Sequence, residues 1–286
     1  MTPKTIHANG LDFAYFEYGT GDNLVLCFHG FPDTAHTWSY FGPALADAGY
    51  RVIAPFLRGY PPSEIPADAD YTGKTLGTDA IALIDAFGAE QAVLIGHDWG
   101  AQVVYAATAL APERVSRLVT VAIPHPRAIK FDLGTLWTAR HFLTFQLRTS
   151  TTNWMKRDPL AALKKIYRRW SPTWDVPDEE LAAAVAMLAE PGAVEGVLGY
   201  YWSFAEARRS RDSAEPNPLR RRTGVPTLSV FGEDDGAIAG AVFERTYDAF
   251  TGPYEQILIP GVGHFPHREA PDDFAAHVLA FLAREV

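Results

Sequence analysis

The sequence predicts an α/β fold in which helices cover both faces of a mostly parallel β-sheet. Short apolar segments rich in β-branched residues alternate with segments of helical periodicity. Several of these apolar segments also lack the polar–apolar alternation that is typical of half-exposed strands. Strands covered on both faces are expected to be apolar throughout, and parallel strands need crossover connections, which are usually helices. A break in this rhythm between about residues 124 and 222 predicts a helical insertion.

Six segments are predicted as strands and three as helices of the sheet domain. The strands are expected at 23–30, 50–56, 91–98, 117–123, 226–232 and 254–261. The helix at 75–89 carries one apolar face, and Gly88 is expected to end it as a C-terminal cap. In the segment 101–115, a helix continues directly from the GHDWG turn and ends ahead of Pro112. The segment 272–285 is amphipathic and is predicted as the C-terminal helix.

The insertion is helical and aromatic, and no β-rich segment occurs in it. We therefore expect the chain to have three parts: a first part of the core at 1–123, a helical cap at 124–222 and a second part of the core at 223–286. The chain has 286 residues, which is enough for one large domain or for a core with a smaller cap.

The composition argues against several classes of protein. The net charge of −9 disfavours nucleic acid and anionic membranes as partners, because both reward clustered Lys and Arg. The single cysteine, Cys27, excludes an internal disulfide and is expected in the core. The N-terminus has no secretory apolar region, and no apolar segment is long enough to span a bilayer. We therefore expect a soluble, cytoplasmic protein, with both a monomer and a homodimer open.

No cofactor is predicted from the sequence. Five of the histidines lack the spacing that is typical of metal ligands. They are His29, His36, His97, His125 and His141.

The segment Gly96–Gly100, GHDWG, joins a predicted strand directly to a helix. Two glycines remove Cβ atoms where such a sharp turn crowds the backbone, and Asp98 would project at the carboxyl edge of the sheet beside a helix N-terminus. Ligand sites of open α/β sheets lie at that edge. Asp98 is therefore either a nucleophile or simply a helix cap.

Three further motifs follow predicted strands. His264 precedes the C-terminal helix, and the acidic turn at 232–235 offers Asp234 and Asp235 to orient a histidine. The motif HGFPD at 29–33 stands where a loop supplies one backbone N–H of an oxyanion hole, here that of Phe31, with the second from Trp99. His267, three residues after His264, is interpreted as an ordinary surface histidine.

Together these motifs resemble the α/β-hydrolases, and most of all the epoxide hydrolase branch. HGFP, GHDWG, GEDD and GxGHF match that pattern along almost the whole core. Within the fold, an aspartate nucleophile indicates an epoxide hydrolase or a dehalogenase. The resemblance implies Asp98 as nucleophile, His264 as base and Asp235 as the third member of the triad, with Asp234 as the alternative. Phe56 stands where the family often has Asp, and we have no mechanistic account of that departure.

The resemblance also implies two hydrogen-bond donors from the cap, usually tyrosines. The pattern G-x-L-x-x-Y in 196–202 selects Tyr201, with Tyr200 next. A segment like Y-x-x-x-F-Q occurs at 141–146, but His141 occupies the tyrosine position. An imidazole N–H can also donate, although a histidine can lose a proton near neutral pH. His141 and Tyr201 could instead be ordinary residues of a packed cap.

The residues resembling this family imply a two-step reaction without a cofactor. A carboxylate is ionised at pH 7 and suits attack on an sp³ carbon, which gives an alkyl ester of Asp98 that His264-activated water then hydrolyses. The expected substrate is a small apolar epoxide. The expected lining residues are Phe31, Trp99, Phe142, Phe145, Trp154, Tyr200 and Trp202.

Two alternatives stay open. A haloalkane dehalogenase would use the same triad; Phe31, where dehalogenases often have Asn, disfavours it, while Trp154, Trp170 and Trp202 could supply a halide donor. A non-catalytic binding protein on this fold is the other alternative. The particular epoxide, its stereochemistry and its regiochemistry are not encoded in these motifs.

Overall fold

One eight-stranded sheet forms the centre of the protein. The computed structural model describes residues 1–286 except 130–136, 138–139, 210–219 and 285–286. The strand order is β1-β2-β4-β3-β5-β6-β7-β8. The strands are β1 (Lys4–Ala8), β2 (Leu11–Tyr18), β3 (Asn23–Phe28), β4 (Tyr50–Pro55), β5 (Ala92–His97), β6 (Val115–Val121), β7 (Thr227–Gly232) and β8 (Tyr254–Ile259).

The predicted mostly parallel sheet is confirmed. Strands β4, β3, β5, β6, β7 and β8 pair in parallel, whereas β2 pairs antiparallel with both β1 and β4. Every residue of β5 and β7 is buried, as expected for strands covered on both faces. The six predicted strands are all present, and none of their ends differs from the prediction by more than two residues.

The N-terminal hairpin of β1 and β2 is not among the predicted strands. Its turn consists of Asn9 and Gly10, both at positive φ (46° and 78°). Asn-Gly is the preferred dipeptide of a two-residue hairpin turn, so the signal was present in the sequence.

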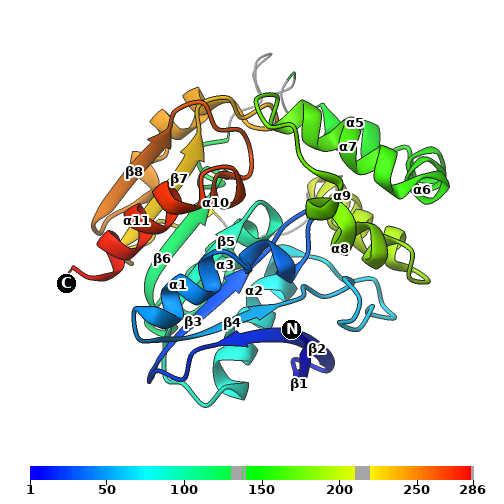
Figure 1. The fold of residues 1–286 in the computed structure, drawn as a ribbon. Coiled ribbons are helices and arrows are strands. Elements are labelled where there is room, and N and C mark those ends of the chain that lie inside the picture. The colour runs from blue at the N-terminus through cyan, green and yellow to red at the C-terminus, as the bar shows by residue number, and fades with distance from the viewer. Residues whose placement is uncertain (130–136, 138–139, 210–219, 285–286) are drawn as a thin grey trace.

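Helices flank the sheet in two layers (Figure 1). Helices α1 (Phe41–Asp47) and α11 (Pro271–Leu282) pack together on one face, and α2 (Gly73–Ala86) and α3 (Trp99–Leu110) on the other. The short α10 (Pro266–Glu269) precedes α11. Gly88 has a φ of 74° just after the C-cap of α2, which confirms its predicted capping place.

A group of helices lies between β6 and β7 in the chain, and we call it the helical insertion. It consists of α5 (His141–Phe145), α6 (Arg148–Arg157), α7 (Pro159–Trp170), α8 (Asp178–Leu188) and α9 (Ala193–Arg209). Figure 1 shows these helices beyond the carboxyl end of β3. The carbonyl of Arg58, which follows β4, accepts a hydrogen bond from the Tyr200 hydroxyl on α9 (2.8 Å). The insertion therefore stands over the edge where the motif residues end their strands.

Among the described helices, none alone is long and apolar enough to cross a membrane. Helices α8 and α9 pass that test only as a pair bent by 89°.

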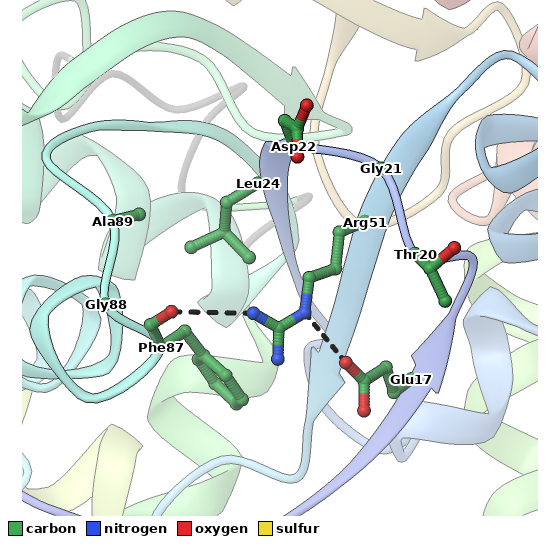
Figure 2. Close-up of a pocket in the computed structure, with 9 residues that line it drawn as sticks. All are labelled: Glu17, Thr20, Gly21, Asp22, Leu24, Arg51, Phe87, Gly88 and Ala89. Atoms are coloured by element: carbon green, nitrogen blue, oxygen red, sulfur yellow. Dashed lines mark hydrogen bonds and ion pairs between the residues drawn. The ribbon is translucent and has the colours of Figure 1, made fainter.

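A cavity of about 430 Å³ lies at the other edge of the sheet (Figure 2). It is bordered by the first residues of β3 and β4 and by the segment that follows α2. The Arg51 guanidinium there donates to Glu17 Oε1 (2.8 Å) and to the Phe87 carbonyl (3.5 Å). Because Asp98 follows the carboxyl end of β5, this cavity is separate from the motif residues.

Candidate active site

Asp98 lies in a strained turn between β5 and α3. Its backbone has a φ of 50° and a ψ of −116°, a conformation that costs a non-glycine residue on the order of 1–3 kcal/mol. A Cβ atom at Gly96 would lie 2.2 Å from the Gly100 carbonyl oxygen, and one at Gly100 would lie 2.1 Å from the Phe28 carbonyl oxygen. Glycines are therefore required on both sides of the turn. The turn holds Asp98 at the carboxyl edge of the sheet, directly before the N-terminus of α3.

The two oxygens of the Asp98 carboxylate have different surroundings. Oδ1 accepts a hydrogen bond from the Phe31 backbone N–H at 2.8 Å. Oδ2 lies 3.4 Å from Nε2 of His264. The Trp99 N–H belongs to the first turn of α3, whose amide groups lack intrahelical acceptors. One carboxylate oxygen is thus held by the loop of the HGFPD motif, and the other faces the histidine.

His264 is oriented by Asp235. The Nδ1–H of His264 donates to Asp235 Oδ2 at 2.8 Å, and Asp235 Oδ1 accepts from the N–H groups of Ala237 and Ile238 (2.7 and 3.0 Å). This bond involves Asp235, whereas the backbone N–H of Asp234 donates to the Val262 carbonyl. Since Nδ1 carries the proton in that bond, Nε2 is the nitrogen that can exchange a proton near Asp98.

The charges of these groups are strongly coupled. Burial opposes ionisation of Asp98, but the adjacent His264 and the Phe31 N–H hold the pKa of its carboxyl below the ordinary value. Burial likewise lowers the pKa of His264, but the carboxylates of Asp235 and Asp98 outweigh it and raise that pKa to about 10. The resting site is therefore an imidazolium between two carboxylates.

Tyr201 stands at the centre of an aromatic cluster opposite Asp98. Its ring centroid lies 4.8–5.2 Å from those of Phe31, Trp99, Phe142 and Phe145. Its hydroxyl is buried and has no hydrogen-bond partner among the described residues. Burial, followed by the charge of Asp98, raises the pKa of this phenol, and the Trp99 side chain opposes that rise. The hydroxyl therefore keeps its proton.

His141 is buried on α5 and belongs to the same cluster. Its ring lies 5.9 Å from that of Tyr201 and 5.0 Å from that of Trp170, which in turn lies 4.9 Å from His264. Gln146, five residues later, donates from Nε2 to the Tyr201 carbonyl at 2.9 Å. That bond fastens α5 to α9, so the Gln of the Y-x-x-x-F-Q pattern fixes both positions relative to each other.

The other predicted lining residues divide into two groups. Phe142 and Phe145 contact Tyr201, as above, and the ring of Tyr200 lies 5.4 Å from that of Trp99, although its hydroxyl donates to the Arg58 carbonyl. Trp202 and Trp154 have other contacts. The indole N–H of Trp202 donates to the Phe145 carbonyl (2.9 Å), and Trp154 lies beside Lys165 of α7.

Sequence reasoning missed a buried ion pair beside the site. Arg268 donates from Nη1 to Asp33 Oδ2 (2.7 Å) and to the Tyr167 hydroxyl (2.9 Å), and from Nη2 to Glu180 Oε2 (2.6 Å). Asp33 closes the HGFPD motif, while Tyr167 and Glu180 belong to the helical insertion. The motif named Asp33, but nothing in the sequence indicated its partner.

The interpretation of His267 as a surface histidine is wrong. Its side chain is fully buried, Nε2 lies 2.6 Å from the Thr37 hydroxyl, and its ring lies 4.6 Å from that of His97. The reason is that three of the four residues of α10 are buried, which periodicity over four residues cannot indicate.

Comparison with known proteins agrees with this geometry. Residues 23–271 match the family described as the alpha/beta hydrolase fold. "Epoxide hydrolase A" of Mycobacterium tuberculosis is 29% identical over 98% of this chain and 97% of its own length, and "Epoxide hydrolase 4" of Mus musculus is 27% identical over 98% and 79%. Among solved structures, Epoxide Hydrolase A from Mycobacterium thermoresistibile superposes with a TM-score of 0.83 at 27% identity, covering 98% of both chains. The chain therefore belongs to the alpha/beta hydrolase fold family and is epoxide hydrolase-like within it.

Proposed function

We propose that this protein opens an epoxide to a vicinal diol through an ester of Asp98. One observation carries the proposal: a carboxylate occupies the strained turn after β5, with one oxygen bound by Phe31 N–H and the other facing His264 Nε2. Relatives across the whole chain are named epoxide hydrolases, which supports the same substrate class.

In the first step, Oδ2 of Asp98 attacks one carbon of the epoxide ring. The carboxylate needs no base, because the pKa of Asp98 is held below its ordinary value. As the new C–O bond forms, the ring C–O bond breaks and its electron pair stays on the former epoxide oxygen. That oxygen needs a proton or strong hydrogen bonds, which Tyr201 and His141 supply from the insertion, and general-acid help of this kind contributes about 10²- to 10⁴-fold.

In the second step, water hydrolyses the ester at its carbonyl carbon. Esterification removes the negative charge of Asp98, which is one of the causes of the raised His264 pKa. Loss of that charge lowers the His264 pKa, so the imidazolium releases its proton to solvent. The neutral Nε2 then takes a proton from the attacking water and later passes it to the departing Oδ2 of the diol. Phe31 N–H already binds Oδ1, where the oxyanion develops, and losing such a donor costs about 10²- to 10³-fold. The Cγ–Oδ2 bond breaks, the diol leaves, and Asp98 regains a carboxylate.

The dehalogenase alternative is disfavoured because a candidate N–H donor for the halide is already engaged in a hydrogen bond. A departing halide is stabilised by N–H donors, and the Trp202 indole N–H is bound to the Phe145 carbonyl. The hydroxyl of Tyr201 is instead a buried donor without a partner among the described residues, and it suits an alkoxide oxygen. The aromatic surroundings favour an apolar epoxide as substrate.

A single-turnover reaction in H₂¹⁸O tests the mechanism. With excess enzyme and styrene oxide, the label is expected in the Asp98 peptide, while the first diol released carries unlabelled oxygen. Label that enters the diol directly and never Asp98 would show that water attacks the epoxide without an ester. Release of bromide from bromoalkanes, compared with diol formation, distinguishes the dehalogenase. A protein that binds epoxides and turns over neither substrate class is the binding protein.

A further inference from the structure

The loop that carries His264 is held by a residue of the connection after α7. Ser171 is completely buried. Its hydroxyl oxygen accepts a hydrogen bond from the His264 backbone N–H at 2.9 Å and donates its own proton to Glu269 Oε1 at 2.7 Å. Ser171 thus bridges the catalytic histidine, by its backbone, to a carboxylate of α10.

Glu269 completes the attachment of the loop. Its Oε2 accepts from the N–H of Gly263 (2.8 Å), and its Oε1 accepts from the N–H of Phe265 (2.9 Å). Three successive backbone N–H groups, those of residues 263–265, are therefore bound by one hydroxyl and one carboxylate. Hydrogen bonds to a charged acceptor are shorter and stronger than neutral ones, so this arrangement is rigid.

The end of α7 also contacts the loop of the catalytic acid. The Trp170 carbonyl accepts from the N–H of Gly236, next to Asp235, at 2.9 Å, and from the N–H of His264 at 3.2 Å. There is no space between these segments: a Cβ atom at Gly263 would lie 2.4 Å from the Ser171 Cα. The backbone at His264 and the backbone next to Asp235 are therefore both hydrogen-bonded to the end of α7.

We propose that Ser171, held by Glu269, is a positioning residue through which the helical insertion aligns His264 for hydrolysis of the Asp98 ester. The inference rests on the proposed function. Asp98 and Phe31 are placed by the turn after β5 and the loop after β3, and no described hydrogen bond connects either of them to Ser171. Loss of the Ser171 hydroxyl should therefore affect the second step and spare the first.

The test separates the two steps in Ser171→Ala and Glu269→Gln. Stopped reactions with excess styrene oxide, followed by intact-protein mass, give the rate at which the ester forms and the rate at which it disappears. We expect ester formation within about twofold of wild type and hydrolysis slower by about tenfold or more, since a small misplacement of a catalytic group has a large effect on rate. Glutamine offers one acceptor oxygen where Glu269 offers two, so it should act in the same direction.

Further readouts distinguish positioning from loosening of the fold. Thr173→Ala, at an exposed position two residues on, is the matched control and should leave both rates unchanged. The rise of the hydrolysis rate with pH should also shift in Ser171→Ala, because a displaced imidazole loses part of its bond to Asp235. Both rates are referred to the fraction of protein that forms the ester, which excludes unfolded molecules.

Unchanged hydrolysis in Glu269→Gln and Ser171→Ala overturns the proposal, and so does an equal fall in both steps. If the wild-type protein forms no ester with Asp98, the proposed function itself fails. The variants and the wild type thus report separately on the two claims.

Discussion

The two sides of the active site differ in how their functional groups are held. On the core side, Asp98 already accepts the Phe31 N–H, and His264 already donates to Asp235. On the insertion side, the Tyr201 hydroxyl is buried among rings with no partner among the described residues. A buried hydroxyl without a partner is unfavourable by about 1–3 kcal/mol, and a ligand oxygen that accepts from Tyr201 would remove that cost.

Under the proposed mechanism, each side meets a different demand of the chemistry. The core side must hold an anion and a base in fixed geometry before substrate arrives, which preorganised hydrogen bonds achieve. The insertion side must respond to charge that arises only when the ring opens. Variants of Asp98 and His264 on the core side should therefore stop attack and ester hydrolysis respectively, whereas variants on the insertion side should slow only the opening of the ring.

The largest effect is expected from the core side, in Asp98→Asn. The amide is a poor nucleophile, so turnover of styrene oxide should fall by at least about 10⁴-fold. Asn is among the residues that best tolerate positive φ, so the turn after β5 should persist and the thermal midpoint should stay near that of wild type. Substantial diol formation by Asp98→Asn would place the nucleophile elsewhere.

The next largest effect is expected in His264→Gln, which should lose ester hydrolysis and keep ester formation. Without a base, the ester should form and then accumulate, and turnover should fall by about 10³- to 10⁴-fold. Intact-protein mass should increase by the mass of one epoxide per chain. A variant that loses ester formation as well would show that the two sides are not separable as described.

Most of the core could be predicted from the sequence because its signals are local. Fully apolar strands, the glycines around Asp98 and the cap at Gly88 each follow from steric or hydrophobic constraints acting within a few residues. The order of the motifs then placed Asp98, Asp235 and His264 together, since the carboxyl ends of parallel strands meet at one edge.

Contacts between distant segments could not be predicted in the same way. Ser171 binds the loop of His264, and Arg268 joins Asp33 of the core to Tyr167 and Glu180 of the helical insertion. A lone serine or arginine carries no local pattern that indicates such a partner. The burial of His267 could not be predicted either, because a helix of four residues is too short to show a periodic buried face.

A smaller effect should come from the insertion side, in Tyr201→Phe. Loss of the hydroxyl should slow ester formation by about 10²- to 10³-fold, because the departing oxygen loses a donor. The neighbouring Tyr200→Phe is the comparison, since that hydroxyl donates to the Arg58 carbonyl. It should lower the free energy of unfolding by about 1 kcal/mol and slow ester formation by less than tenfold. Equal effects of the two variants on ester formation would contradict the role of Tyr201.

The smallest effect concerns the identity of the second donor. An imidazole can change its charge between about pH 5 and 8, whereas a tyrosine does not, and the imidazolium is the stronger donor. Ester formation in the wild type should therefore slow by up to about tenfold as the pH rises through the point at which His141 loses its proton. His29 and His264, with pKa values near 4 and 10, do not titrate there, and the lowered pKa of Asp98 keeps it ionised throughout. His141→Tyr should flatten the profile while keeping ester formation, as measured by single turnovers across the range. A profile that keeps its slope in His141→Tyr would remove His141 from ring opening and leave Tyr201 as the donor that the insertion provides.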